Sequence, residues 1–170
     1  MLAARTIIAL LACASLCFTS CNAVPSGAPT KPVIAVQEWS PATCGGATGA
    51  PPSNMSGPEL TLFNLLQSPT GGSAGPDTLT GVAKWHAQDM ANSHSIGFVG
   101  SDGEDVYRRV TCSGTAGGTW IGVIAVGQSS DANAVMTAIK NDFAAYSILT
   151  AGWTFVSVGQ SDGYWMIILK

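Results

Sequence analysis

The stretch of sequence that decides the fold runs from Trp153 to Leu169 and reads WTFVSVGQSDGYWMIIL. Two runs rich in β-branched and aromatic residues flank a polar tetrapeptide, and the Asp162-Gly163 pair within it is typical of the tight turn of a β-hairpin. We therefore predict antiparallel strands at 153–159 and 164–169. A third strand is predicted at 120–126, a dense apolar run bounded by glycines.

Helices are predicted ahead of and between these strands, from apolar residues that recur at helical spacing. They cover 59–67, 77 to about 92, a short segment at 104–110, and one helix that begins at Ser130 or Asp131. The last helix carries an apolar stripe that we expect to be buried: Val135, Met136, Ile139, Phe143 and Tyr146. This order of elements indicates the α+β class, with helices packed against an antiparallel sheet. Three tryptophans lie on predicted strands and are expected in the core: Trp120, Trp153 and Trp165.

Length and charge limit the classes of function. The chain has 170 residues, enough for one domain, and its hydrophobic fraction of 46% argues against a disordered chain. Seven Lys and Arg against ten Asp and Glu give a net charge of −3. Because no basic surface is expected, nucleic acid is excluded as the expected partner. We expect a monomer.

The first 20 residues have the pattern of a secretory signal. Arg5 is followed by an uncharged run, 6–18, which is too short for a bilayer span of roughly 20 apolar residues. The run ends at Phe18-Thr-Ser-Cys21, which resembles a bacterial lipobox, so we predict a lipoprotein signal at 1–20 and lipidation of Cys21. The chain would then be held on the outer face of a membrane in the cell envelope. Ordinary secretion, for example with cleavage after Ala23, is the alternative.

Residues 21–56 are rich in Ala, Pro, Gly, Ser and Thr and are predicted to be a flexible tether, with the folded domain at 57–170. Within the tether, residues 33–36 together with Trp39 could add a short strand. Cys44 and Cys112 are the two cysteines that remain after export and lipidation, and an even pair in an exported protein predicts a disulfide. A zinc site is disfavoured, because neither cysteine has a second Cys or His nearby.

Several short motifs, taken in order, resemble the bacterial branch of the CAP superfamily, which includes cysteine-rich secretory proteins, antigen-five venom proteins and plant pathogenesis-related proteins. The resemblance covers nearly all of 59–170 and implies the family fold, a three-layer α-β-α sandwich. The matching segments are Leu62-Phe-Asn-Leu-Leu66, His86-Ala-Gln-Asp-Met-Ala91, Gly100-Ser-Asp-Gly103 with Arg108, Gly122-Val-Ile-Ala-Val-Gly127, Ser147-Ile-Leu149 with Gly152-Trp153, Val156-Ser-Val-Gly159 and Tyr164-Trp165.

Family members typically hold two histidines and two acidic residues in a cleft that can bind a divalent metal. Counted along the matched motifs, the first histidine falls at Phe98, an acidic residue at Gly122 and the second histidine near Ala144. None of these three side chains can coordinate a cation or carry a proton. The resemblance therefore implies a degenerate cleft, and we predict no catalytic residue, no bound metal and no cofactor. His94, four residues before Phe98, could enter the cleft by a loop shift.

Two further groups of polar residues are candidates for metal chemistry. His86 and Asp89 share a helical face and His94 follows it, so together they could offer two imidazoles and a carboxylate. Because His86 lies in an apolar stripe, a packed core histidine is the favoured interpretation. A second group, Asp102, Glu104 and Asp105, could bind calcium, but helix-start charges and local ion pairs explain its spacing better.

These observations favour a non-catalytic binding or scaffold domain on the bacterial cell surface. The alternative is a carrier of an apolar small molecule or lipid, because apolar replacements suit a cleft to apolar ligands. A metal-assisted hydrolase ranks third and requires His86 or His94 to line a concave site. The expected partners are a membrane, through the lipid anchor, and an unknown protein or lipid ligand.

Overall fold

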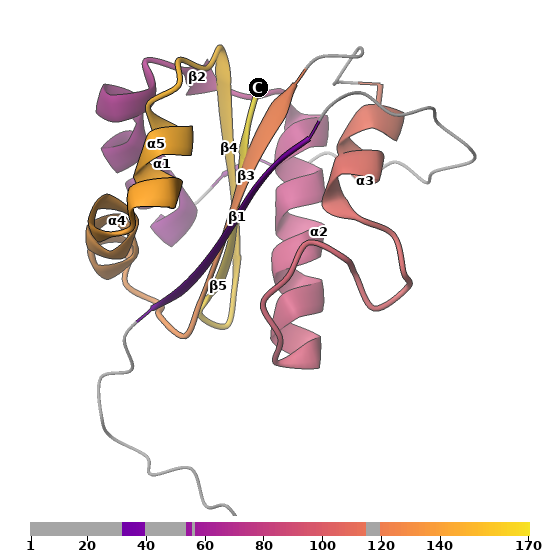
Figure 1. Cartoon of the computed structure of the whole chain (residues 1–170). Helices are drawn as coiled ribbons and strands as arrows, with labels where there is room; N and C mark the ends of the chain where they lie inside the picture. The colour runs from indigo at the N-terminus through magenta and orange to yellow at the C-terminus, as the bar shows by residue number, and fades with distance from the viewer. Residues whose placement is uncertain (1–31, 40–53, 56, 115–119) are drawn as a thin grey trace, which may run out of the picture.

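The computed structural model describes residues 32–39, 54–55, 57–114 and 120–170. Within these ranges the elements follow in the order β1 (Val33–Trp39), α1 (Gly57–Thr70), β2 (Ser73–Ala74), α2 (Asp77–Ser93), α3 (Val106–Cys112), β3 (Ile121–Gly127), α4 (Ala132–Asn141), α5 (Phe143–Leu149), β4 (Phe155–Ser161) and β5 (Tyr164–Leu169) (Figure 1).

The strands form one sheet in the order β1-β3-β5-β4-β2. All neighbouring strands are antiparallel except β2 and β4. β2 is a two-residue strand in the connection between α1 and α2, and it runs parallel to β4. The sheet is therefore mixed rather than purely antiparallel, and its parallel part is confined to one short edge.

The hairpin predicted near the carboxyl end is present. β4 and β5 pair from Val156 opposite Leu169 to Ser161 opposite Tyr164, which leaves two residues in the turn. These residues, Asp162 and Gly163, have φ angles of 44° and 80°. Positive φ at both central positions is what a type I′ turn requires, and Asp-Gly adopts it readily.

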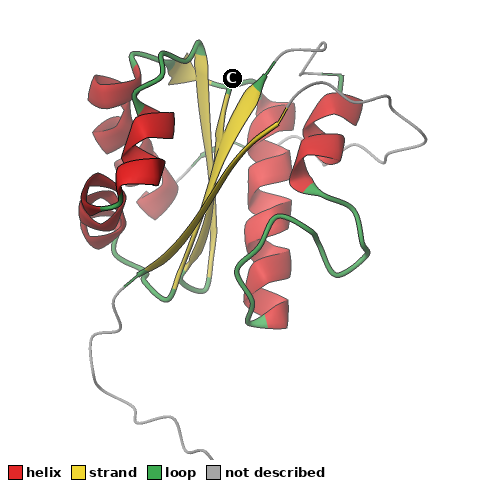
Figure 2. Ribbon diagram, viewed as in Figure 1, coloured by secondary structure: helices red, strands yellow, loops and turns green. Residues whose placement is uncertain are grey.

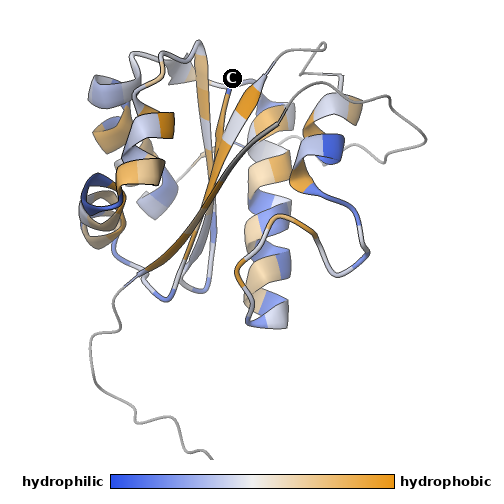
Figure 3. Ribbon diagram, viewed as in Figure 1, coloured by the Kyte–Doolittle hydropathy of each residue, from blue (hydrophilic) through white to orange (hydrophobic). Residues whose placement is uncertain are grey.

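Helices cover both faces of the sheet, which gives three layers (Figure 2). α1, α4 and α5 lie on one face, and α2 and α3 on the other. Successive residues of β3 therefore face different layers: Ile124 packs toward α1, α4 and α5, and Val123 toward α2 and α3. A strand covered on both sides needs a continuous apolar run. Apolar residues accordingly concentrate on the strands and on the helix sides that face them (Figure 3).

The single helix expected to follow Asp131 is divided into α4 and α5. Asp142 is extended, with φ −98° and ψ 114°, and its carboxylate accepts a hydrogen bond from the N–H of Ala145 at 2.9 Å. Aspartate is a favoured N-cap, so it starts a new helix in the middle of the expected one. The helix axis changes at this point, and the expectation that Phe143 and Tyr146 are buried is wrong: their side chains are 89% and 39% exposed.

β1 lies within the segment expected to be a tether. It pairs antiparallel with β3 from Val33 opposite Gly127 to Trp39 opposite Ile121. One edge strand of the sheet therefore lies before residue 57. It includes residues 33–36 and Trp39, where the sequence allowed a short strand within the tether. The signal segment, Cys21 and Cys44 lie outside the described residues, so the anchor and the disulfide of Cys44 with Cys112 stay predictions. Among the described helices none is long and apolar enough to cross a membrane.

The three strand tryptophans have different environments. Trp165 is fully buried, and its indole N–H donates to the carbonyl of Ser129 at 2.5 Å. Trp153 is half-buried, whereas Trp120 is 60% exposed, so the expectation of a core position is wrong for Trp120. β3 begins one residue later, at Ile121, and the indole of Trp120 therefore lies beyond the covered part of the sheet.

The edge of the sheet at β4 is closed partly by a side chain. β2 pairs only with Phe155 and Val156. Farther along the strand, the carboxylate of Glu59, in the first turn of α1, accepts a hydrogen bond from the N–H of Gln160 at 3.0 Å and pairs with Lys84 Nζ at 2.9 Å. Glu59 is only 5% exposed. It satisfies a backbone donor that β2 is too short to reach.

Candidate functional site

The two histidines and Asp89 do not converge on one point. His86 is fully buried, and its Nε2 donates to the carbonyl of Gly97 at 2.9 Å. Asp89 accepts hydrogen bonds from the N–H and the hydroxyl of Ser101, at 2.7 and 2.5 Å. His94 is exposed and ends α2 with a φ of 51°. In the described part of the chain, no group of three or more His, Cys, Asp or Glu side chains is placed to hold a metal ion.

These polar groups hold the loop between α2 and α3, residues 94–105, against α2. Asp102 forms an ion pair with Arg109, and the guanidinium of Arg109 lies 3.4 Å from the centre of the Trp85 ring, a cation–π contact. Asp105 caps α3 by accepting from the N–H of Arg108 at 2.6 Å. Glu104 pairs with Arg108 at 3.1 Å, so all three carboxylates of the candidate calcium group are used in a cap or an ion pair.

Burial and neighbouring charges shift the pKa values of His86 and Asp102, which hold this loop. Desolvation lowers the pKa of His86, and Arg109 lowers it further; the Gly97 carbonyl, Asp89 and Asp102 oppose the shift. The Nε2–H bond to Gly97 fixes the neutral tautomer, and Nδ1 then faces the core with no hydrogen-bond partner among the described residues. The hydrogen bond from Arg109 lowers the pKa of the exposed Asp102 carboxyl.

We expect the fold to lose stability as the pH falls below about 6.5, the ordinary pKa of histidine. Below this pH the unfolded chain binds a proton at His86, whereas the folded chain does not, because the pKa of the buried His86 is lowered. The contribution of His86 to the free energy of unfolding is therefore fully present above about pH 6.5 and is lost as the pH falls toward the lowered pKa. The free energy of unfolding, measured by urea titration between pH 7 and pH 5, checks this.

Matched variants identify the group responsible. His86→Gln should be less stable at pH 7 but should lack most of the decline in this pH range. His94→Asn, which keeps a residue suited to the left-handed conformation, should retain the decline of the wild type. An unchanged pH dependence in His86→Gln would contradict the assignment.

The three positions that the resemblance assigns to the cleft lie apart. Phe98 is half-buried and packs on the α2–α3 side of the sheet. Ala144 is exposed on the first turn of α5, on the opposite side. Gly122 lies on β3, and its Cα faces the α5 side, toward Ile148 and Trp153.

The space at Gly122 is already filled. A Cβ atom placed there would lie 2.8 Å from Ile148 Cγ2 and 2.8 Å from Trp153 Cζ2. The Trp153 indole is held in this position by a hydrogen bond from its N–H to the carbonyl of Ile148, at 2.6 Å. No local signal in the sequence links Trp153 to Gly122. The position assigned to an acidic residue by the resemblance is thus taken by the indole of Trp153 and the side chain of Ile148.

Trp153 also borders an open groove, which we call the aromatic groove. It has a volume of about 340 Å³ and is lined by Trp120, Gly152, Trp153, Thr154, Phe155 and Lys170. Most of the lining surface is apolar. Sequence reasoning missed this site because it placed Trp120 in the core; the signal available was the Gly-Gly pair that precedes Trp120.

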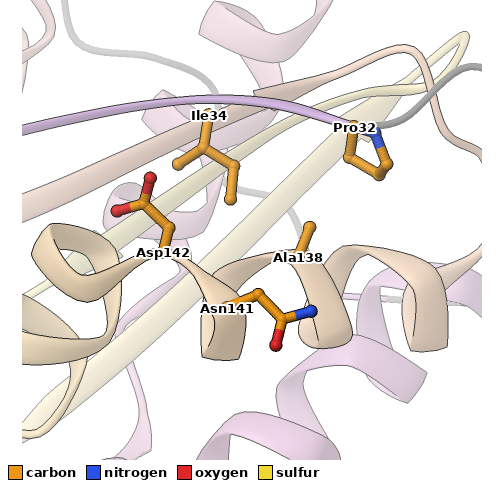
Figure 4. Close-up of a pocket in the computed structure, with 5 residues that line it drawn as sticks. All are labelled: Pro32, Ile34, Ala138, Asn141 and Asp142. Carbon is orange, nitrogen blue, oxygen red and sulfur yellow. The ribbon is translucent and has the colours of Figure 1, made fainter.

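A smaller hollow of about 140 Å³ lies between the start of β1 and the junction of α4 and α5 (Figure 4). Ile34 points from β1 toward Ala138 and Asp142, and Pro32 and Asn141 complete the lining. Most of this lining surface is polar. Its volume is below the range of roughly 300–1,000 Å³ that is usual for small-molecule sites.

Comparison with known proteins gives the fold. No family model matches the chain, and no curated protein matches it. Among solved structures it is similar to an extracellular protein containing an SCP domain from Bacillus anthracis str. Ames, with a TM-score of 0.58 and 18% sequence identity. The match covers 65% of this chain and 39% of that one, so the chain spans about two fifths of that structure's length. The chain therefore has a CAP-like (SCP-like) α+β fold, as the sequence motifs implied.

Proposed function

We propose that this protein is an exported, lipid-anchored, non-catalytic CAP-like binding module that uses the aromatic groove to hold its ligand. The observation that carries the proposal is the position of Trp153. One side of its indole fills the space at Gly122, and the same residue lines the groove beside the exposed Trp120. Trp153 thus connects the filled position at Gly122 to the groove that we propose as the binding surface.

The composition of the groove supports recognition of a partner. Exposed tryptophan is the side chain that most often dominates the energy of binding interfaces, because it buries a large area with few rotatable bonds. Trp120 is 60% exposed and Phe155 lies in the same groove, with Lys170 at its border. We infer that the partner is an exported or surface protein that presents an apolar segment.

A carrier of an apolar small molecule or lipid is the second candidate. The apolar lining and the volume of about 340 Å³ favour it, because this volume is within the usual range for small ligands. The groove is open to solvent, however, and would bury less of a lipid chain than a closed cavity. A hydrolase has less support, because His86 and Asp89 are occupied by Gly97 and Ser101.

We expect Trp120→Ala to weaken binding at the groove at least tenfold, as truncation of a central tryptophan typically costs about 2 kcal/mol. The dye 1-anilinonaphthalene-8-sulfonate is a suitable probe, measured by fluorescence titration of the exported chain. Leu60→Ala is the matched control, because Leu60 is 45% exposed on α1 and does not line the groove. Equal affinities in wild type and Trp120→Ala would refute the groove as the site.

Two further measurements separate the candidate ligands. A photo-crosslinking amino acid at position 120, compared with position 60, should give a discrete protein adduct in the native envelope if the partner is a protein. Stoichiometric lipid in solvent extracts of the wild type, absent from Trp120→Ala, would favour the carrier.

The anchor is tested separately. We expect the full chain to take up an alkyne-labelled fatty acid and to partition with the membrane fraction, because several acyl chains give stable anchoring. Cys21→Ser should lose the label and leave the membrane fraction, and Cys17→Ser should keep both. A mature amino terminus at residue 24 in the wild type would contradict the anchor and support ordinary secretion.

A further inference from the structure

One edge of the sheet is open. β1 is the outermost strand next to β3, and in the part of the chain that the structure describes no strand pairs with its other side. In Figure 1 β1 is the strand nearest the viewer, and no helix or strand crosses in front of it. The strand is seven residues long and reads VIAVQEW, with one charged residue and no proline or lysine.

The opposite edge of the sheet, at β4, is covered, unlike the edge at β1. There β2 covers the start of β4, and the buried Glu59 carboxylate binds the free N–H of Gln160. Proteins block exposed edges with short strands, prolines, lysines or inward-pointing charges, because an open edge pairs with other chains. This protein uses such devices at β4, and β1 shows neither a proline nor a lysine. An edge that is left unprotected is expected to have a partner.

Apolar side chains flank the open edge. Val33, at the start of β1, is 46% exposed. α5 packs beside β1, and its Phe143 and Tyr146 are 89% and 39% exposed. Phe143 directly follows Asp142, which borders the hollow under Ile34, so this aromatic patch adjoins the first half of the strand. Phe143 and Tyr146 thus form an exposed aromatic patch on the helix that packs next to β1.

We propose that the open edge of β1 is the interface with a second copy of this chain, paired antiparallel about a two-fold axis. An edge strand is self-complementary in this arrangement, since each copy supplies the donors and acceptors that the other lacks. The two five-stranded sheets would then form one continuous sheet of ten strands. In the flanking sequence, 25–32 and 41–52 each contain three prolines, and a proline has no N–H to donate to a ladder.

The available area indicates a weak dimer. A buried aromatic side chain contributes roughly 150–250 Å², so the exposed parts of Phe143 and Tyr146 supply about a third of the ~800 Å² per partner in a standard interface. The strand edge and Val33 must provide the rest. We therefore expect an equilibrium between monomer and dimer that depends on concentration, whereas the sequence alone predicted a monomer. Confinement of the chain to a membrane surface would raise its local concentration and shift this equilibrium toward the dimer. The pairing itself does not depend on the anchor or on the aromatic groove.

Antiparallel symmetry makes a sharp prediction. Along an antiparallel ladder, hydrogen-bonded residue pairs alternate with non-hydrogen-bonded pairs. A two-fold axis between two pairs would make neighbouring pairs identical, so the axis must pass through the centre of one pair. One residue of β1 therefore lies directly opposite the same residue of the second copy. Its two Cα atoms would be roughly 4.5–5.5 Å apart, within the range for a disulfide. Single cysteines placed at each position from 33 to 39 in the exported full chain should therefore give one position with strong disulfide-linked dimers under mild oxidation.

The controls are the wild type, which keeps Cys44 and Cys112, and Thr137→Cys on the exposed side of α4. Both should stay monomeric on non-reducing gels. Dimers at position 137 as strong as those in β1 would show that the crosslinks arise from random collision. The absence of dimers at all seven positions of β1 would overturn the proposal.

Sedimentation of the same chain over a range of concentrations gives an independent measurement. Phe143→Asp should weaken the dimer at least tenfold without loss of folding, because the side chain is exposed and acidic residues suit the first turn of a helix. Leu60→Asp on α1 should leave the dimer unchanged. If the outward amides of β1 exchange slowly at concentrations where the chain is monomeric, the chain's own residues cover the edge and the proposal fails.

Discussion

Gly122→Glu should unfold the protein rather than create a metal-binding cleft. The new side chain would overlap Ile148 and Trp153, whose atoms lie 2.8 Å from the position of its Cβ. Overpacking of this kind costs about 1–3 kcal/mol, and the buried carboxylate without a partner adds several more. We expect the free energy of unfolding to fall by more than about 4 kcal/mol, a large part of the 5–15 kcal/mol that typically holds a domain together.

Urea denaturation followed by circular dichroism measures this loss. Gly122→Ala isolates the steric part and should cost about 1–3 kcal/mol. Adding Trp153→Leu to Gly122→Ala should cost less than the sum of the two single changes, because the smaller side chain relieves the overlap. A Gly122→Glu variant that keeps its stability within about 1 kcal/mol would contradict the close packing of Ile148 and Trp153 at Gly122.

Gly159→Ala is expected to cause the second large loss. A Cβ at this position in β4 would lie 2.2 Å from the carbonyl carbon of Ala83 and 2.2 Å from the N of Lys84 in α2. These are backbone atoms, so no rotamer change relieves the contact and the whole helix must move away from the sheet. Displacement of α2 also disturbs the packing of His86, and we expect a loss of more than about 3 kcal/mol.

The matched control for this change is Gly97→Ala. Gly97 has no other atom within 4 Å of the position of a new Cβ. Its substitution should change the unfolding free energy by no more than about 0.5 kcal/mol. Thermal and urea unfolding of the two variants, side by side, would check the difference. If Gly159→Ala costs as little as Gly97→Ala, the close packing of α2 on β4 is wrong.

The sequence predicted the scaffold better than the site, and particular residues show why. The hairpin was predictable because Asp162 and Gly163 act locally, through backbone angles that few other pairs adopt. The split at Asp142 was not, because the same aspartate is compatible with a helix surface and with an N-cap. Trp120 was misplaced because strand propensity does not reveal where the covering layers end.

For the candidate site, the sequence by itself determined which side chains stand at the three positions that the resemblance assigns to the cleft. Phe98, Gly122 and Ala144 carry no ionisable group, and this holds however the chain folds. It also determined the α+β class, because apolar periodicity and turn chemistry are local properties. The tertiary structure decided what packs at one of these positions: the indole of Trp153 lies at Gly122, 31 positions away in the sequence. It also decided that Glu59 closes one edge of the sheet and that β1 leaves the other open. Such contacts depend on which elements pack side by side, and packing joins residues that the sequence separates.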